Sequence, residues 1–334
     1  MRMAARSAIM GRRFHSSPCF PNMLLLFAQL LIGLLMLTAG AEGLVRGAAS
    51  LARRLGLSPL VIGLTIVAFG TSTPELVVSL GAALQGNSGI ALGNVVGSNI
   101  GNIGLILGGA ALIASLRVQA QIVRLDIPIM IGVSVALALM LIDGRVGRIE
   151  GLVLVAGLIA YTGFTVVAAR RSASPDVADT FDSGVPAQHS VGRDLLFVAG
   201  GLALLMGGAQ LLVNAAVTIA EDLGVSQTVI GLTIVGVGTS LPELATSFAA
   251  ALRGEADIAI GNVVGSNIFN ILGILGTTAL AQPLAAELNL VDIGAMLGLA
   301  LLTLPLARTG YTLRRREGAA LLLLYAGYLA VLLA

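Results

Sequence analysis

The chain has 334 residues, of which 57% are hydrophobic and 11% charged, and its mean hydropathy is +0.97. A soluble domain carries roughly 25% charged residues, so this composition excludes a soluble globular protein and indicates a membrane protein with several spans. The formal net charge of +2 is too small to indicate a nucleic-acid partner.

Residues 1–22 form a basic tail with four arginines and no acid. The apolar run that begins at Met23 is too long for a signal-peptide core and has no convincing cleavage site. We therefore interpret it as a retained membrane span. Because Met23 is itself a possible start, the sequence leaves open whether the tail is native.

Ten apolar runs are long enough to cross a bilayer, which takes about 20 residues each. The long connection at 170–193 is rich in Ser, Pro and Asp, and it divides the spans into a first repeat, 23–169, and a second repeat, 194–334. We interpret the connection as a plain cytoplasmic linker rather than a regulatory cation sensor. The expected spans are 23–45, 59–84, 88–114, 122–142, 150–169, 194–217, 226–252, 256–281, 287–307 and 318–334.

The arginines predict an orientation. Loops after odd-numbered spans hold 13 arginines when Arg124, at the start of the fourth span, is counted with them, and loops after even-numbered spans hold 2. Because Lys and Arg concentrate in cytoplasmic loops, we expect the odd-numbered loops to be cytoplasmic and both termini to lie on the other side of the plasma (inner) membrane. The four arginines of the basic tail would instead favour a cytoplasmic N-terminus.

The second span opens an internal repeat. Residues 58–112 align without a gap on residues 226–280, at a constant offset of 168, with 36 identities in 55 positions. Five spans separate equivalent positions, and five is odd, so the second copy must enter the membrane in the opposite orientation. Inverted repeats with interrupted helices at matching positions are typical of secondary transporters. We therefore expect an all-α integral membrane protein of ten transmembrane helices, built as two inverted five-helix repeats in which helices 2, 3, 7 and 8 are broken.

Both copies contain a helix breaker beside a carboxylate. Pro74 has no N–H, so the carbonyl of Gly70 loses its helical partner, and Pro242 does the same to Gly238. Inside a membrane such a carbonyl is tolerated only where protein, water or a ligand satisfies it. The break should therefore expose carbonyl oxygens beside oxygen-bearing side chains. Those side chains are Thr71, Ser72 and Glu75 in the first copy and Thr239, Ser240 and Glu243 in the second.

The next span of each copy carries a second polar motif, "GNVVGSNIGN" in the third span and "GNVVGSNIFN" in the eighth. In each motif a serine and an asparagine lie four residues apart, so both project from one helical face. The glycine pairs of these motifs should let neighbouring helices pack tightly. The serine–asparagine pairs are Ser98 with Asn102 and Ser266 with Asn270, and the glycine pairs are Gly93 with Gly97 and Gly261 with Gly265.

The combined set offers only oxygen ligands. Hard cations such as Na⁺ and Ca²⁺ bind oxygen, and Ca²⁺ takes six to eight such ligands. Two glutamates would neutralise one Ca²⁺. Soft metals would want Cys or His, but the chain has one Cys, and its two His lie outside the apolar spans. We expect no cofactor and no disulfide.

Three acids lie apart from this set. Glu42 in the first span is expected to pair with Arg46 near an interface rather than to bind a cation. Asp126 and Asp292 are offset by 166 residues, so we interpret them as near-equivalent markers of span ends.

The tandem motifs "GTSTPEL" with "GNVVGSNIGN" and "GTSLPEL" with "GNVVGSNIFN" resemble the two alpha-repeats of the sodium/calcium exchanger family, within the cation/Ca²⁺ exchanger superfamily. They cover about a third of the chain. The resemblance implies an electrogenic antiporter, not an enzyme, that moves Ca²⁺ against Na⁺ by alternating access, and it implies no regulatory Ca²⁺-sensing domain between the halves. The cation ligands that it implies are Glu75, Glu243, Thr71, Ser72, Thr239, Ser240, Ser98, Asn102, Ser266, Asn270 and the carbonyls of Ala68 and Gly236.

The chain departs from the family at one point. Some members carry Asp at one of the positions held here by Asn102 and Asn270, so this site has two formal negative charges rather than three. The Na⁺ stoichiometry and a role for K⁺ stay open, as do divalent selectivity, the direction of flux and the oligomeric state. The implied partners are the bilayer and small cations, with no nucleic acid and no obligate protein partner.

Three other functions are alternatives. A proton/Ca²⁺ antiporter could use the same two glutamates. An intramembrane protease would need a Ser/His or paired-Asp arrangement that the spans do not offer. A cation channel is the third alternative. Duplicated broken helices fit an alternating-access transporter better than a channel, but cation flux without a counter-ion would favour the channel.

Overall fold

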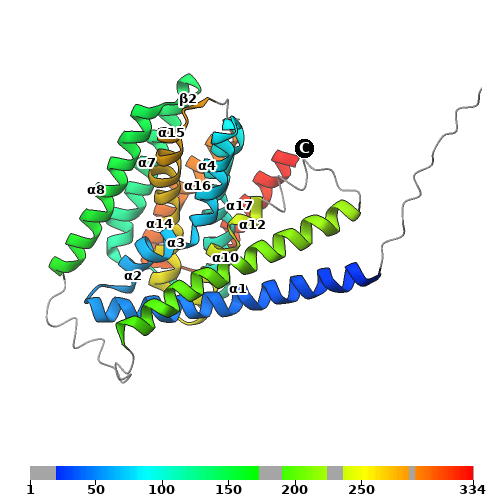
Figure 1. The fold of residues 1–334 in the computed structure, drawn as a ribbon. Helices are drawn as coiled ribbons and strands as arrows, with labels where there is room; N and C mark the ends of the chain where they lie inside the picture. Colours follow the sequence, from blue (N-terminus) through cyan, green and yellow to red (C-terminus); the bar gives the residue numbers. More distant parts are fainter. Residues whose placement is uncertain (1–19, 173–189, 224–235, 286–289, 334) are drawn as a thin grey trace, which may run out of the picture.

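The computed structural model describes residues 20–172, 190–223, 236–285 and 290–333, which are helical apart from four two-residue strands and the connecting turns (Figure 1). Seven of the described helices are long and apolar enough to cross a membrane, or eight if one bent pair counts as a single span. The prediction of an all-α membrane protein is thereby confirmed. Most of the predicted tail and linker, residues 1–19 and 173–189, lies outside the described residues.

The first half runs through five spans. Its elements are α1 (Phe20–Leu55), α2 (Pro59–Ile62), η1 (Gly63–Val67), α3 (Ala68–Thr71), α4 (Thr73–Leu84), α5 (Ser88–Gly101), η2 (Asn102–Leu107), α6 (Gly108–Ile113), β1 (Leu116–Arg117), η3 (Ile122–Asp126), α7 (Ile127–Met140), η4 (Leu141–Asp143), β2 (Arg145–Val146) and α8 (Arg148–Ser172).

The second half repeats much of this order. Its described elements are α10 (Val191–Asp222), α12 (Gly236–Thr239), α13 (Leu241–Leu252), α14 (Ala256–Phe269), η6 (Asn270–Leu275), α15 (Gly276–Ala281), β3 (Leu284–Ala285), α16 (Leu290–Arg308), η7 (Thr309–Tyr311), β4 (Thr312–Leu313) and α17 (Arg315–Leu333).

Two of the ten expected spans are not among the helices that meet the spanning criteria. The span expected at 226–252 falls partly on residues 224–235, which lie outside the described part of the chain. The span expected at 318–334 corresponds to α17, a 19-residue helix whose first turn carries two arginines and Glu317. The count of ten therefore stays a prediction.

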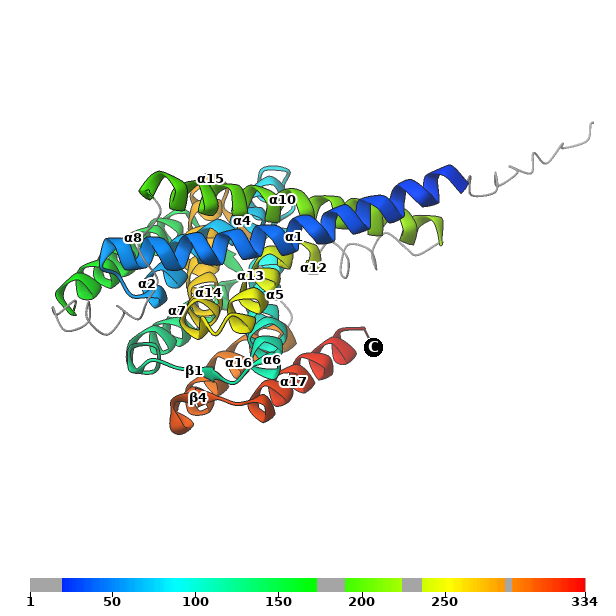
Figure 2. The same cartoon turned by 90° about the horizontal axis from the view of Figure 1, so that it is seen from below.

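The two helices that carry the asparagine motifs form the centre of the molecule. In the most apolar window of helix 256–281, 94% of the residues are buried, and in that of helix 88–113 the share is 72%. The other spanning helices bury only 22 to 33% of theirs, which is typical of helices that face lipid on one side. The long helices α1 and α10 cross one side of this centre, while α16 and α17 lie on the opposite side (Figure 2).

Helices α1 and α10 lie side by side in both views (Figures 1 and 2) because glycines line their contact. A Cβ atom added to Gly40 would lie 2.8 Å from the carbonyl oxygen of Gly201, and one added to Gly33 would lie 2.9 Å from that of Gly208. These contacts recur every seven residues along α1 and run in reverse order along α10, so the pair is antiparallel. Without side chains between them the backbones approach closely, which favours helix association in a membrane.

Two short ribbons join loops of different halves. Strand β1, which follows the third span, pairs antiparallel with β4, with Leu116 opposite Leu313. Strand β2, which follows the fourth span, pairs with β3, with Val146 opposite Leu284. Each ribbon therefore fixes a loop of one half to a loop of the other.

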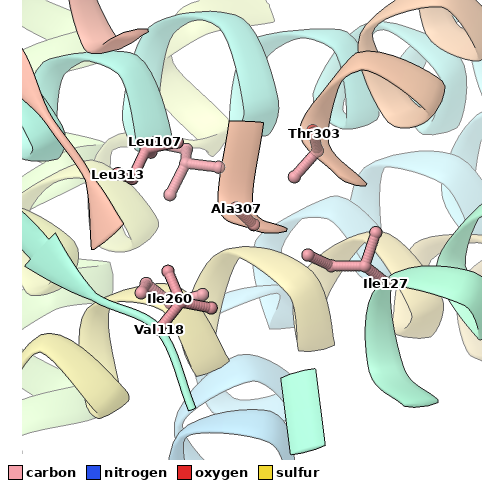
Figure 3. A pocket seen from close by; sticks show the side chains of 7 residues that line it. All are labelled: Leu107, Val118, Ile127, Ile260, Thr303, Ala307 and Leu313. Carbon is pink, nitrogen blue, oxygen red and sulfur yellow. The ribbon is translucent and has the colours of Figure 1, made fainter. Parts of the chain in front are cut away.

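A small pocket beside the central helices is apolar (Figure 3). Its one side-chain hydroxyl, on Thr303, already donates a 2.8 Å hydrogen bond to the carbonyl of Leu299. The pocket therefore offers no free oxygen ligand and is not a cation site. It is lined by Leu107, Val118, Ile127, Ile260, Thr303, Ala307 and Leu313.

Adjacent glycines of α10 provide a matched test of the close helix contact. A Cβ on Gly201 would lie 2.6 Å from the backbone nitrogen of Leu44, whereas one on Gly200 meets nothing within 4 Å. We expect Gly201→Ala to lower the free energy of unfolding by about 1–3 kcal/mol through overpacking. Gly200→Ala should be neutral or stabilise by up to about 1 kcal/mol through helix propensity. Thermal unfolding of the two detergent-purified variants measures the difference, and equal unfolding midpoints would contradict the contact.

Candidate cation site

The second span of the first half is a broken helix, as predicted. The segments 59–71 and 73–84 are bent by 45°. Ser72, the residue between them, has φ −82° and ψ 9°, which is a turn conformation rather than a helical one. The helix restarts with Pro74 and Glu75 in its first turn, where a missing N–H costs nothing and the positive end of the helix dipole favours a carboxylate.

The second half repeats this local geometry. Ser240 lies between α12 and α13 with φ −88° and ψ 6°, and α13 begins with Pro242 and Glu243 in its first turn. Both glutamates are about 1% exposed. The prediction of a duplicated break beside a buried carboxylate is thereby confirmed for the described residues.

The two breaks are joined by reciprocal hydrogen bonds. The hydroxyl of Ser72 donates to Oε1 of Glu243 at 2.7 Å, and the hydroxyl of Ser240 donates to Oε1 of Glu75 at 3.0 Å. The carboxylate of each half is thus held by a serine of the other half. The hydroxyls of Thr71 and Thr239 also lie within hydrogen-bonding reach of the same two carboxyl groups.

Helices 3 and 8 do not break, so that part of the fold prediction was wrong. Residues 88–113 and 256–281 each form one continuous helix. No proline interrupts them, so every N–H can still donate. Each instead widens into a π-helical segment that begins at the predicted ligand, Asn102 in η2 and Asn270 in η6. Such segments occur frequently at functional sites.

Two further asparagines connect these helices to the carboxylate-bearing turns. Nδ2 of Asn94 donates to the backbone carbonyl of Glu75 at 3.1 Å and to Oγ of Ser79 at 2.9 Å. Nδ2 of Asn262 donates to the carbonyl of Glu243 at 3.3 Å. Both asparagines lie in the repeated motifs of the central helices, and their identity in the two copies is a signal for a role that the predicted ligand set does not include.

Asn262 also joins the halves. Its Nδ2 donates to Oγ of Ser247 at 2.9 Å, and its Oδ1 accepts a 3.1 Å hydrogen bond from the hydroxyl of Thr71. A second link runs between the central helices, where Nδ2 of Asn270 donates to Oδ1 of Asn99 at 3.0 Å. The Thr71–Asn262 bond thus holds the broken helix of the first half against the central helix of the second half, and the Asn270–Asn99 bond holds the two central helices together.

Several buried oxygens of this region have no hydrogen-bond partner. Buried polar groups are almost always paired in proteins, so a group of unpaired acceptors needs an explanation. Oxygen atoms without partners are what a bound cation would coordinate. The unpaired oxygens include Oε2 of Glu75, Oε2 of Glu243, Oδ1 of Asn102, Oδ1 of Asn267, Oδ1 of Asn270, Oγ of Ser266 and Oγ1 of Thr246, and one amide donor, Nδ2 of Asn99, is also unpaired.

The remaining predicted ligands differ in how free their oxygen atoms are to bind a cation. Ser98 is buried on α5, one turn before Asn102. The carbonyl of Ala68 already accepts hydrogen bonds from the Ser72 N–H at 3.1 Å and from the Thr71 hydroxyl at 3.3 Å, so it would have to exchange one of them for a cation. Its equivalent, Gly236, is the first residue of α12. The structure leaves the ligand role of each residue as a prediction.

The acids expected to lie outside the site do so. Glu42 pairs with Arg46 as predicted, and it also pairs with Arg253 at the end of α13. Asp126 accepts a 3.1 Å hydrogen bond from the Tyr161 hydroxyl, and Asp292 accepts a 2.9 Å bond from that of Tyr328. Both aspartates lie near helix starts, in agreement with their interpretation as span-end markers.

The predicted glycine ridge is present in the second half. A Cβ on Gly261 would lie 3.0 Å from the carbonyl of Leu60, and one on Gly265 would lie 2.6 Å from that of Leu64. For Gly93 and Gly97 the equivalent partner segment falls mostly on residues 224–235, outside the described part of the chain, so this half of the ridge stays a prediction.

The chain is similar over most of its length to known exchangers and antiporters. A family model described as "Sodium/calcium exchanger protein" matches residues 25–167 and 194–334. The chain is 40% identical over 305 residues to the putative antiporter CaxA of Alkalimonas amylolytica, with 89% of this chain and 95% of that protein covered. It is 36% identical over 342 residues to the sodium/calcium exchanger MaX1 of Methanosarcina acetivorans, with 92% of this chain and 98% of that protein covered.

Solved structures agree with these relatives. The fold matches the sodium-calcium exchanger NCX_Mj soaked with 2.5 mM Na⁺ and 1 mM Sr²⁺ with a TM-score of 0.82, at 36% identity and over 92% of this chain and 98% of that one. The same exchanger soaked with zero Na⁺ and Ca²⁺ gives a TM-score of 0.81 at 35% identity, over 92% of this chain and 99% of that one.

Removal of one asparagine tests the link between the halves. Asn262→Leu removes the amide donor to the Ser247 hydroxyl and to the backbone carbonyl of Glu243, and it removes the acceptor of the Thr71 hydroxyl, which still has the carbonyl of Ala68. A buried polar group that is left unsatisfied costs about 1–3 kcal/mol, so the free energy of unfolding of the variant should fall by about 1–3 kcal/mol or more. Asn214→Leu changes an exposed asparagine of α10 and serves as the control. Thermal unfolding in detergent compares them, and similar losses in both variants would contradict the assigned role.

Proposed function

The chain belongs to the sodium/calcium exchanger family, and on that premise we propose that it exchanges Na⁺ for Ca²⁺ across the membrane by alternating access. The family is one of transporters rather than enzymes. The observation that carries the proposal is the set of unpaired buried oxygens on the carboxylate-bearing turns and the central helices, which includes Oε2 of Glu75 and Oε2 of Glu243. Two carboxylates with neutral amide and hydroxyl oxygens form the donor set that Na⁺ and Ca²⁺ prefer.

The mechanism that we propose is competition. Both cations need the same two carboxylates, so the site must release one before it accepts the other. In the state described here, a serine of the opposite half occupies one oxygen of each carboxylate. A cation that entered would compete with these hydroxyl donors, and the hydroxyls would then turn their oxygens towards it. A cation can drive a conformational change only if it binds two states with different affinity.

The proposed architecture is ten helices in two inverted repeats, with breaks in helices 2 and 7. The reciprocal serine–glutamate bonds support it, because each has its equivalent at the repeat offset. The ribbons support it as well. Loops that pair must lie on the same face of the membrane, so an even number of crossings must separate β1 from β4 and β2 from β3. The predicted spans place six crossings between β1 and β4 and four crossings between β2 and β3.

Transport would then use Glu75, Glu243 and the surrounding hydroxyl and amide oxygens as ligands. These further ligands are Thr71, Ser72, Thr239, Ser240, Ser98, Asn102, Ser266, Asn270 and the carbonyls of Ala68 and Gly236. We place the protein in the plasma (inner) membrane with both termini outside the cytoplasm, as the arginine distribution predicts.

Neutralising either carboxylate tests the ligand assignment. We expect Glu75→Gln and Glu243→Gln each to lower the initial rate of Ca²⁺ uptake by about 30-fold or more, because losing one partner of a buried charge pair costs about 2–5 kcal/mol. Glu150→Gln is the control, since this carboxylate only accepts a hydrogen bond from the Gly147 N–H outside the site. Uptake into proteoliposomes is measured, and size-exclusion chromatography confirms folding. Normal uptake by a folded Glu75 or Glu243 variant would refute the assignment.

The coupling ion is tested with proteoliposomes loaded with Na⁺. Radioactive Ca²⁺ uptake should require internal Na⁺ and should stop when external Na⁺ matches it, at equal pH on both sides. Replacing external Na⁺ with choline or with K⁺ separates the effect of Na⁺ from that of K⁺. Uptake that ignores Na⁺ but follows an internal acid load would assign the same two glutamates to proton/Ca²⁺ antiport instead.

A further inference from the structure

The two halves differ in how their long helices contact the broken helices. Helix α1 packs along α13 of the other half (Figure 2), whereas the equivalent helices α10 and α4 make no comparable contact. Transporters with inverted repeats alternate by moving one repeat or bundle against the other. Exchanging the conformations of the two halves would therefore place α10 against α4 and withdraw α1 from α13. The structure shows one of these two arrangements.

The contact between α1 and α10 is symmetric, unlike that between α1 and α13. Gly33 is equivalent to Gly201 and Gly40 to Gly208, at the repeat offset of 168. The contact of Gly40 with Gly201 is therefore the same as that of Gly208 with Gly33. A contact that maps onto itself can persist when the halves exchange conformations. The contact of α1 with α13 does not map onto itself, so side chains that stabilise it favour one arrangement over the other.

An ion pair joins α1 to the end of α13. Nε of Arg253 donates to Oε2 of Glu42 at 2.8 Å, and Nη2 of the same arginine pairs with Oε1. Such a two-point contact fixes the orientation of both groups. The two side chains are 31% and 40% exposed, so the pair can open without leaving a buried charge. Arg46, one turn further along α1, also pairs with Glu42 and would stay with it when Arg253 moves away.

The equivalent positions of the other half carry no charge. Glu42, Arg46 and Arg253 correspond at the repeat offset to Gln210, Asn214 and Gln85. Gln210 donates to Asn214 of its own helix at 2.7 Å. The two turns have the same shape, since Gly254 has φ +76° and Gly86 has φ +81°. The difference between the halves therefore comes from the side chains, and the opposite arrangement would bring together two amides in place of an ion pair.

We infer that Glu42 and Arg253 form a latch that favours the arrangement described here, so that the two faces of the membrane present the cation site with unequal apparent affinity. Arg253 follows the end of α13 opposite to Glu243, so the pair acts through the position of α1 and not as a ligand. Both are positioning residues. The effect on cation affinity rests on the proposed function, whereas the latch itself can be tested without transport.

The first experiment measures the position of α1 directly. Full-length Cys19→Ser protein in lipid nanodiscs carries nitroxide labels on cysteines at Leu55 of α1 and Leu252 of α13, which are 53% and 73% exposed. Pulsed electron paramagnetic resonance gives the distribution of distances between the labels. We expect Glu42→Gln to change the ratio of two distance populations by about 1.5- to 5-fold, the range for exposed ion pairs. Arg46→Gln is the matched control, because it removes a partner of Glu42 within α1 and should leave the ratio unchanged.

Moving the latch to the other half gives a second test with the same labels. Gln210→Glu combined with Gln85→Arg places the charged pair at the equivalent positions. This double variant should populate the second distance more than wild type does, and adding Glu42→Gln should populate it further. One distance population that stays the same in wild type and in all of these variants would overturn the inference.

Transport from each face tests the consequence for affinity. Exchange of radioactive for unlabelled Ca²⁺ is measured in inside-out and right-side-out vesicles, so that no coupling ion is needed. Glu42→Gln should raise the half-saturating Ca²⁺ concentration on one face and lower it on the other, because a smaller share of a state weakens apparent binding to it. A purely structural loss would not produce opposite changes. Unchanged values on both faces would refute the effect on affinity. Wild-type protein without Ca²⁺ exchange would refute the proposed function, while the label distances would still decide the latch.

Discussion

Two hydrogen bonds join the halves of the molecule where their helices are broken, from Ser72 to Glu243 and from Ser240 to Glu75. At both points a proline prevents a continuous helix, and in a membrane the polar groups freed by a break must find partners inside the protein. The break of one half supplies the donor for the carboxylate of the other. The remaining carboxylate oxygens stay unpaired, so the same constraint that ties the halves together also leaves room for a cation.

The rest of the fold holds these breaks in place. The glycine contact between α1 and α10 forms one close-packed wall beside the buried central helices. On the central helices, Asn94 and Asn262 hold the carboxylate-bearing turns by their backbone carbonyls. Fixing a turn by its backbone leaves the glutamate side chain free to bind a ligand. Lipid provides no hydrophobic force between helices. Close contacts of small residues and hydrogen bonds from amides therefore hold the helices together here, as apolar side-chain packing does in a water-soluble protein.

Much of the site was readable from the sequence because it occurs twice. The proline, the hydroxyls and the glutamate recur at a constant offset, and chemistry that recurs with its spacing is rarely a packing accident. The roles of Asn94 and Asn262 were not predictable in the same way, since a bond from a side chain to the backbone of another helix depends on how the helices pack. The pairing of Glu42 with Arg253 joins residues 211 positions apart and has no local signal. Helices 3 and 8 were expected to break like helices 2 and 7, but without a proline the backbone only widened.

The reciprocal bonds have a consequence for the origin of the chain. A bond from half one to half two, matched by the equivalent bond in the other direction, is what a two-fold axis between identical subunits generates. The paired ribbons have the same reciprocal form, since β1 and β4 join the same loops of the repeat as β3 and β2. A gene encoding one half, whose product inserted in both orientations, would already have made both bonds as a homodimer. The two halves are not identical, because Asn99 accepts a hydrogen bond from Asn270 of the other half whereas Asn267 donates to the carbonyl of Val263 in its own helix.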